Sequence, residues 1–311
     1  MSAAEAVGGA GATGRAGSLR DAAGGTGPAG VEPRRSQGLL GASWRLLRSE
    51  LRLILGRRRN RAGILVLASV PVLLAVALRA SAPSSEGGGP DLISAATSNG
   101  VFVALTALTV EMALFLPLAV AVLSGDTVAG EANIGTLRYL LTVPVGRTRL
   151  LLVKYVSLVV GALIGVVVVA GTGIVVGGTL LGLGPTTLLS GNQISLVEAL
   201  GRVALAALYV TAGLAGLAAI GLFVSTLTEQ PIAAMVTTTI ISSAMWIMDG
   251  IPQLDWLAPW LLVHRWSAFV DLFRDPVFTE VMRTGLLVDL GYIVVFLALA
   301  WARFANKDLT S

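Results

Sequence analysis

An acidic side chain lies deep inside one of the long apolar stretches of this sequence. Glu111 stands near the middle of the apolar run from 101 to 123. An ionised group at that depth in a membrane is costly unless it is paired, protonated or in contact with water. Two interpretations stay open: Glu111 lines a path for a substrate or a proton, or it is a neutral carboxyl bonded to a neighbouring Ser or Thr.

Other residue types that perform chemistry are sparse. The chain has no cysteine, which excludes disulfides, thiolate nucleophiles and thiolate metal sites. Its one histidine, His264, argues against a protein-built zinc centre, and we interpret it as structural. Neither Lys154 nor Lys307, the only lysines, completes a phosphate-binding loop. The sequence therefore predicts no catalytic residue, no metal and no cofactor, so any ATPase is another polypeptide.

Composition identifies the solvent of this chain as lipid. Hydrophobic residues make up 55% and charged residues 13%, whereas soluble domains carry about 25% charged residues. Eleven arginines fall within the first 61 residues. Nucleic-acid binding is one interpretation of that cluster. We favour a cytoplasmic flank that follows the positive-inside rule, because apolar spans follow directly.

The pattern predicts an all-α polytopic membrane protein with both termini in the cytoplasm. Residues 1–37 read as a disordered cytoplasmic tail, and residues 38–311 as the membrane domain. An amphipathic helix in the membrane interface is expected over 43–61. Six transmembrane helices are predicted at about 63–78, 101–123, 151–183, 203–225, 231–247 and 286–301.

Several features qualify these spans. The span at 151–183 is longer than a bilayer requires, so it tilts, projects or breaks near its glycines. We expect those glycines to permit close helix packing: Gly161, Gly165, Gly171, Gly173, Gly177 and Gly178. Asp289 and Arg202 are expected at the interface. Between spans five and six, short re-entrant helices should dip into the outer leaflet, with Trp256, Trp260 and Trp266 near the headgroups.

The segment 124–150 is a long connection that contains charged residues, glycines and a proline. It carries Glu131, the pair Gly135-Thr136, a Leu-rich turn, and then Pro144 and Arg147. A plain link between two spans needs only a few residues, so we expect helices that lie parallel to the membrane. A rigid helix at the cytoplasmic surface is what a soluble partner needs in order to push on the spans.

These residues resemble the signature of the ABC-2 type transporter permeases. The resemblance rests on Gly130-Glu131, Gly135-Thr136-Leu137, the run Leu140 to Val145, and then Arg147 and Lys154. It extends to the layout of spans and to the F-x-x-K-D-L ending at Phe304–Leu309. The chain departs from the family at Ala132-Asn133, where charged residues are usual, and at Gly146, where Ser is usual.

The resemblance implies a function and a set of partners. It implies that Glu131, Gly135, Thr136, Pro144 and Arg147 form the coupling site for a separate ATP-binding subunit. Two copies of the chain and two such subunits would then form an exporter in the inner (plasma) membrane of a bacterium. The chain itself would be no enzyme. Its substrate is undetermined, although a mostly apolar pathway suits an amphipathic compound.

Three other interpretations were weighed against this one. The residues of segment 124–150 could merely cap and anchor interfacial helices, although that role does not require all of these residue types together. An ion-coupled secondary transporter could use Glu111, and it predicts inverted repeats and broken helices at midplane; no convincing repeat is present. An intramembrane enzyme lacks the usual acid–base residues.

Overall fold

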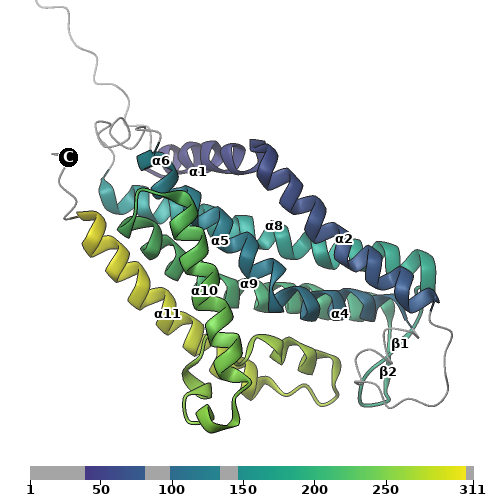
Figure 1. Cartoon of the computed structure of the whole chain (residues 1–311). Coiled ribbons are helices and arrows are strands. Elements are labelled where there is room, and N and C mark those ends of the chain that lie inside the picture. Colours follow the sequence, from purple (N-terminus) through teal and green to yellow (C-terminus); the bar gives the residue numbers. More distant parts are fainter. Residues whose placement is uncertain (1–38, 81–98, 134–145, 306–311) are drawn as a thin grey trace, which may run out of the picture. The chain divides into compact units, whose positions relative to one another are not determined.

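The computed structural model describes residues 39–80, 99–133 and 146–305, which are mostly helical (Figure 1). The chain divides into two units, Met1–Leu39 and Leu40–Ser311, and the arrangement below concerns the second. Its α-helices are α1 (Leu39–Gly56), α2 (Arg58–Ala80), α4 (Gly100–Ala113), α5 (Phe115–Thr127), α6 (Ala129–Asn133), α8 (Arg147–Leu181), α9 (Leu196–Leu227), α10 (Pro231–Asp249) and α11 (Thr279–Ala305).

Within the described part of the chain, five helices are long and apolar enough to cross a membrane: α2, α8, α9, α10 and α11. The bent pair α4–α5 brings the number to six if the pair counts as one span. Helices α2, α10 and α11 expose large apolar side chains such as Leu65, Ile232 and Leu287. Such surfaces are stable only against lipid, so the chain is a multi-pass membrane protein.

The predicted span 101–123 is formed by two helices rather than by one straight helix. Helices α4 and α5 meet at Leu114 with a bend of 55°. Pro117 explains the break, because it has no N–H for the carbonyl of Ala113 and its ring clashes with that carbonyl. The N–H of Leu114 bonds instead to the carbonyl of Glu111, at 3.3 Å. The break therefore lies beside the one acidic residue of this span.

Helix α8 runs unbroken for 35 residues, which excludes the predicted alternative of a break at its glycines. At 1.5 Å per residue it is roughly 50 Å long, well beyond the ~30 Å hydrocarbon core. Its glycines permit the expected close packing at two positions. A Cβ on Gly173 would lie 2.6 Å from the Cα of Ala104, and one on Gly177 2.4 Å from the carbonyl oxygen of Gly100. At Gly171 a Cβ would meet nothing within 4 Å.

The predicted interfacial helix 43–61 also requires correction, because α1 ends at Gly56 and α2 begins at Arg58. The two helices form an elbow that closes on its own side chains. Asn60 donates to the carbonyl of Ile54 at 2.8 Å, and Arg61 to that of Leu55 at 3.0 Å. These bonds satisfy carbonyls that the end of α1 would leave without partners. Figure 1 shows α1 and α2 meeting end to end at this elbow.

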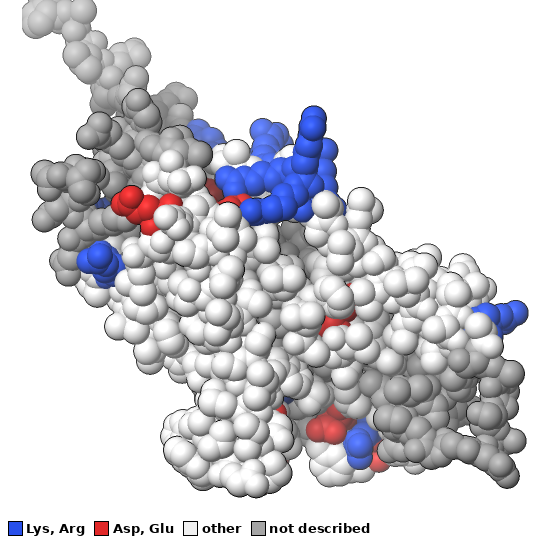
Figure 2. Space-filling view, viewed as in Figure 1, with Lys and Arg blue, Asp and Glu red and all other residues white. Residues whose placement is uncertain are grey.

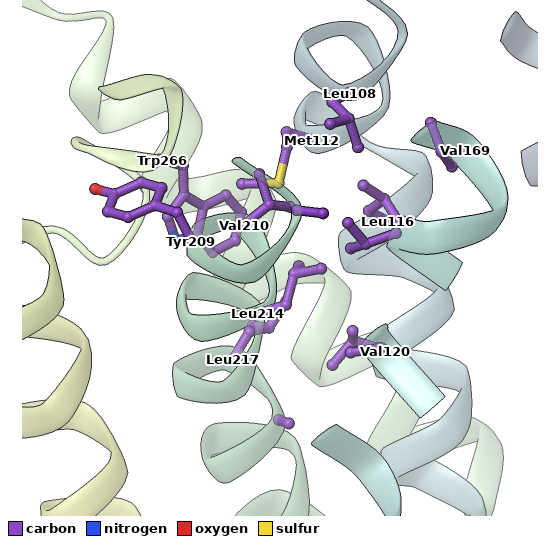
Figure 3. Packing of buried hydrophobic residues seen from close by; sticks show 14 of the residues in the cluster. Leu108, Met112, Leu116, Val120, Val169, Tyr209, Val210, Leu214, Leu217 and Trp266 are labelled. Carbon is purple, nitrogen blue, oxygen red and sulfur yellow. The ribbon is translucent and has the colours of Figure 1, made fainter. Parts of the chain in front are cut away.

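Helix α9 forms the centre of the bundle and is buried over most of its length. Figure 3 shows its residue Val210 beside Met112 of α4 and Trp266, with Leu214 and Leu217 further along the same helix. Trp266 was expected among the headgroups, yet it is only 2% exposed. Its indole fits against Gly213 of α9, where a Cβ would come within 2.7 Å of the ring. The missing side chain at this glycine is what admits the indole.

Asp289 is likewise buried rather than interfacial, with 4% of its surface exposed. The reason is that α11 begins at Thr279, several residues before the predicted start of the sixth span, so Asp289 lies inside the helix. It packs there against Gly216 of α9. Arg202 binds the carbonyl of Leu272 at 2.7 Å and pairs with Glu198 at 2.8 Å, which fixes the segment before α11 to α9.

The described connections at the other end of the bundle contain only short regular elements. A two-stranded antiparallel hairpin joins α8 to α9, with β1 (Thr186–Thr187) paired to β2 (Gln193–Ile194). Three 3₁₀ turns lie between α10 and α11: η1 (Pro252–Leu254), η2 (Ala258–Trp260) and η3 (Trp266–Phe273). Short helical pieces were expected in this stretch.

The contact between α4 and α8 generates a stability prediction. Gly177→Ala places a methyl group against the backbone of Gly100, so one helix must move. We expect a loss of about 1–3 kcal/mol, the usual cost of overpacking, and a lower melting temperature in detergent. Gly171→Ala is the matched control on the same helix, and it should leave the melting temperature unchanged or slightly raised. Equal behaviour of the two variants would contradict the close packing.

Candidate functional site

Charged side chains gather at the end of the bundle where α1 meets α2. Figure 2 shows Lys and Arg concentrated there, above a broad surface with few charges. We call six of these residues the ionic cluster: Glu50, Arg57, Arg59, Asp126, Glu131 and Lys154. They come from α1, the elbow, α2, α5, α6 and α8, so the cluster joins elements that are far apart in the sequence.

Lys154 of α8 is the centre of the ionic cluster. Its ammonium lies 2.5 Å from Glu131 Oε1 and 3.3 Å from Glu50 Oε1, and it donates to the carbonyl of Thr127 at 3.0 Å. The side chain is only 1% exposed. A buried ammonium is tolerated only when it is paired and hydrogen-bonded. These three contacts meet that condition and attach α1, α5 and α6 to the start of α8.

The carboxyl of Glu131 is held in a partly dry environment. Burial raises the pKa of Glu131 above its ordinary value, although the ammonium of Lys154 acts in the opposite direction. Desolvation is therefore a large part of the cost of this pair. The pair is worth little as added stability, but removal of Lys154 would leave two largely buried carboxylates, Glu131 and Glu50, without its ammonium.

Helix α6, which carries Glu131, is held by hydrogen bonds to α9. The backbone N–H groups of Val128 and Ala129 both donate to Oγ of Ser225, at 3.2 and 3.0 Å. These are donors that the start of a short helix leaves without intrahelical partners. Ser225 is fully buried, so it supplies the cap without water.

Close packing of small residues reinforces this attachment. A Cβ on Gly125 of α5 would meet Met235 of α10 at 2.5 Å, and one on Gly221 of α9 would meet Ser124 at 2.2 Å. The ends of α5, α9 and α10 thus approach one another at backbone distance. Any displacement of α6 must pass into these helices.

A second carboxylate, Asp126, holds the elbow. Both Arg57 and Arg59 contact its Oδ2, and Asp126 is only 14% exposed. Two guanidinium groups on one carboxylate tie the elbow to the end of α5. Between Asp126 and Glu131 lies a polar cavity of about 30 Å³, which has room for about one water molecule.

The structure places the predicted coupling residues as follows. Glu131 lies at the middle of α6 and belongs to the ionic cluster. Arg147 is the first residue of α8, at the same end of the bundle. Gly135, Thr136 and Pro144 fall outside the described residues. Only the beginning and the end of the predicted coupling segment are therefore placed.

Glu111 does not join this cluster. It is fully buried in α4, and neither carboxyl oxygen has a hydrogen-bond partner among the described residues. The interpretation that it bonds to a neighbouring Ser or Thr is therefore wrong. The 13 residues of α5 separate it from the cluster, a distance of ~20 Å at 1.5 Å per residue.

Sequence reasoning missed the roles of Lys154, Glu50 and Asp126. One signal was available for Lys154, because it stands inside the apolar run L-L-L-V-K-Y-V-S-L-V-V. A lysine there must find an acidic partner or reach water. Nothing local identifies the partner, since Glu50 lies 104 positions away in the chain. His264 likewise pairs with Asp249, at 2.6 Å, on the other end of the bundle.

A family model described as "Protein of unknown function (DUF2705)" matches residues 91–310, a range that includes all the described helices from α4 to α11. No curated protein matches the chain.

The ionic cluster generates a double-mutant prediction. Lys154→Met keeps the length of the side chain but removes the ammonium from both Glu131 and Glu50, and we expect it to lose about 3–5 kcal/mol of stability. Adding Glu131→Gln should restore part of the loss, because only the carboxylate of Glu50 then faces the uncharged side chain. Thermal unfolding of the purified single and double variants measures the coupling. Strictly additive losses would show that the two side chains do not depend on each other.

Proposed function

The chain belongs to the DUF2705 family, and from this premise we propose that it is the membrane-spanning permease subunit of an ATP-driven exporter of the ABC-2 type. In this proposal two copies of the chain pair with two copies of a separate ATP-binding subunit. The chain carries no nucleotide site of its own and catalyses no reaction. The support comes from the resemblance around Glu131 and from the way α6 is attached to the bundle.

One observation carries the proposal: α6 is a short surface helix that is fastened to three membrane helices. Glu131 joins it to α8 through Lys154, Ser225 caps it from α9, and α5 leads directly into it. Its last residue, Asn133, is exposed. A soluble partner that pressed on such a helix would displace the ends of several spans at once. A free loop could not transmit that displacement.

The transport step follows from this attachment. Closure of the ATP-binding subunits would push α6 and shift the equilibrium between two packings of the spans.

In this proposal the chain has six spans, with the bent pair α4–α5 as the second. Both termini lie in the cytoplasm, and the membrane is the bacterial inner membrane. The arginine-rich elbow then lies on the cytoplasmic side, as the positive-inside rule requires. The substrate class suggested by the apolar spans is an amphipathic compound.

The proposal is tested by what co-purifies with the chain. From native membranes in mild detergent, we expect a stoichiometric ATP-binding subunit. Asn133→Arg puts a bulky charge on the exposed end of α6 and should abolish its capture. We choose Asn133 because Glu131 also holds the fold together, so its replacement would confuse loss of docking with loss of structure.

Gln253→Arg is the matched control, since Gln253 is an exposed polar residue at the opposite end of the bundle. It should retain the ATP-binding subunit at the level of the unmodified chain. When expressed without the ATP-binding subunit, both variants should elute from size exclusion as the unmodified chain does. A chain that purifies alone as a stable, functional assembly would overturn the proposal.

A second candidate function is supported by Glu111. An ion-coupled secondary transporter needs a broken helix and an acidic group near the midplane, and the bend at Leu114 lies beside this buried carboxyl. A helix bend beside a buried carboxyl also suits an exporter that binds a cationic substrate at Glu111 without ion coupling.

The two candidates are distinguished by the energy source. Efflux of a fluorescent amphipathic cation, ethidium, is followed in cells that express the chain with its partners. The exporter predicts loss of efflux on ATP depletion while the proton gradient is kept. The secondary transporter predicts efflux that survives ATP depletion, stops with an uncoupler and is lost in Glu111→Gln. Glu280→Gln, an exposed acid on α11, is the control and should be neutral in both cases.

A further inference from the structure

A deep apolar groove opens directly below the elbow of α1 and α2. It has a volume of about 320 Å³, at the lower end of the range of about 300–1,000 Å³ for ligand pockets. Helices α2, α5 and α8 form its walls and the end of α1 closes it. Representative lining residues are Ile54, Gly63, Leu67, Leu116, Leu123 and Gly165. Figure 2 shows the surface hollowed beneath the basic side chains of this elbow.

The apolar lining alone does not identify an occupant. In a bilayer the bulk lipid tails are as apolar as leucine, so they cover any such surface without preference. A specific occupant needs a polar group that fixes it at one end. The groove has such an end, because Arg59 and Asn60 line its mouth beside the elbow.

The mouth is strongly positive. Four arginines lie between positions 57 and 61. Of these four, only Arg57 and Arg59 contact an acid within the described part of the chain, and both contact Asp126. Arg58 and Arg61 are exposed beside them. Guanidinium groups match phosphate oxygens in pairs, with directed N–H donors. The combination of an apolar slot and guanidinium groups at one end fits a molecule with one apolar tail and one anionic head.

We propose that this groove holds an acyl chain of an anionic phospholipid, with the phosphate at Arg59 and its neighbouring arginines. This proposal goes beyond the exporter function, since it requires only that the helices span a bilayer. The head of the lipid would lie at the elbow, and its tail would run between α2 and α5 toward Gly165. Basic pockets between membrane helices are known to favour anionic headgroups.

The position of the groove gives the lipid a structural consequence. Ile54 and Leu55 of α1 face the same cavity as Phe115 and Leu123 of α5. A tail in this space would therefore touch the interfacial helix and the bundle together. Asp126 fixes the elbow from the polar side, and the lipid would fix it from the apolar side.

The tail site is tested by filling it. Gly63 lines the groove and a Cβ there meets nothing within 4 Å, so Gly63→Leu is chosen to add apolar bulk at this position. Gly171→Leu is the matched control, because Gly171 is an equally open glycine on α8 that does not line the groove. Each protein is purified in mild detergent and its bound lipid is identified by native mass spectrometry. We expect phosphatidylglycerol or another anionic phospholipid on the unmodified chain and on Gly171→Leu, and loss of most of it from Gly63→Leu.

The headgroup site is tested in nanodiscs that contain phosphatidylglycerol and phosphatidylcholine. Arg59→Gln should lower retention of phosphatidylglycerol by about fivefold, as expected for one arginine at a membrane surface. Retention of phosphatidylcholine should not change. Arg79→Gln, at the far end of α2, is the control and should keep both lipids at the level of the unmodified chain.

Four outcomes would overturn the proposal. The first is equal lipid on Gly63→Leu and on the unmodified chain, and the second is equal retention of both lipids by the unmodified chain. The third is a bound mass that is not a phospholipid, which would identify a transported compound instead. The fourth is a change of oligomeric state in Gly63→Leu with lipid unaffected, which would place a second copy of the chain in the groove. None of these outcomes depends on an ATP-binding partner, so they do not test the exporter proposal, which has its own experiment.

Discussion

The burial of one ammonium group organises the charged end of this protein. Lys154 is almost inaccessible to solvent, and a bare ammonium in that position would be prohibitively costly. The chain must therefore bring two carboxylates and a carbonyl to it, from α1, α6 and the end of α5. The places of α1 and α6 are tied to this requirement, and α6, with 5 residues, is too short to be held by its own hydrogen bonds.

Packing carries the constraint from the cluster into the membrane. Lys154 lies on the buried side of α8, and Gly173 and Gly177 bring the same helix into backbone contact with α4. On the other side, Ser225 binds α6 to α9, the most buried of the five long apolar helices. As a result, a movement of one of these helices changes its contacts with several others. This arrangement is the physical basis on which the proposed coupling role rests.

Much of the helical layout could be predicted from the sequence, because apolar length and flanking charges are local properties. The break at Leu114 was not predicted, although Pro117, which causes it, is present in the sequence. The unbroken run of apolar residues around Pro117 favoured the interpretation of a single span. The burial of Trp266 and Asp289 could not be predicted, since it depends on which face of α9 each one meets. Within the ionic cluster only Glu131 was singled out, and that through a motif. The pairing of Lys154 with Glu50 is set by the tertiary fold alone.

The uninterrupted length of α8 has a mechanical consequence. Lys154 and Gly177 are 23 residues apart on one rigid rod, or ~35 Å at 1.5 Å per residue. Gly177 is pressed against the backbone of Gly100, so this contact resembles a pivot near one end of the rod. By simple geometry, a tilt of about 10° at the pivot would move the ammonium of Lys154 by roughly 6 Å. That is more than the span of any bond in the ionic cluster. A tilt of this size at Gly177 would therefore break the contacts of Lys154 in the ionic cluster.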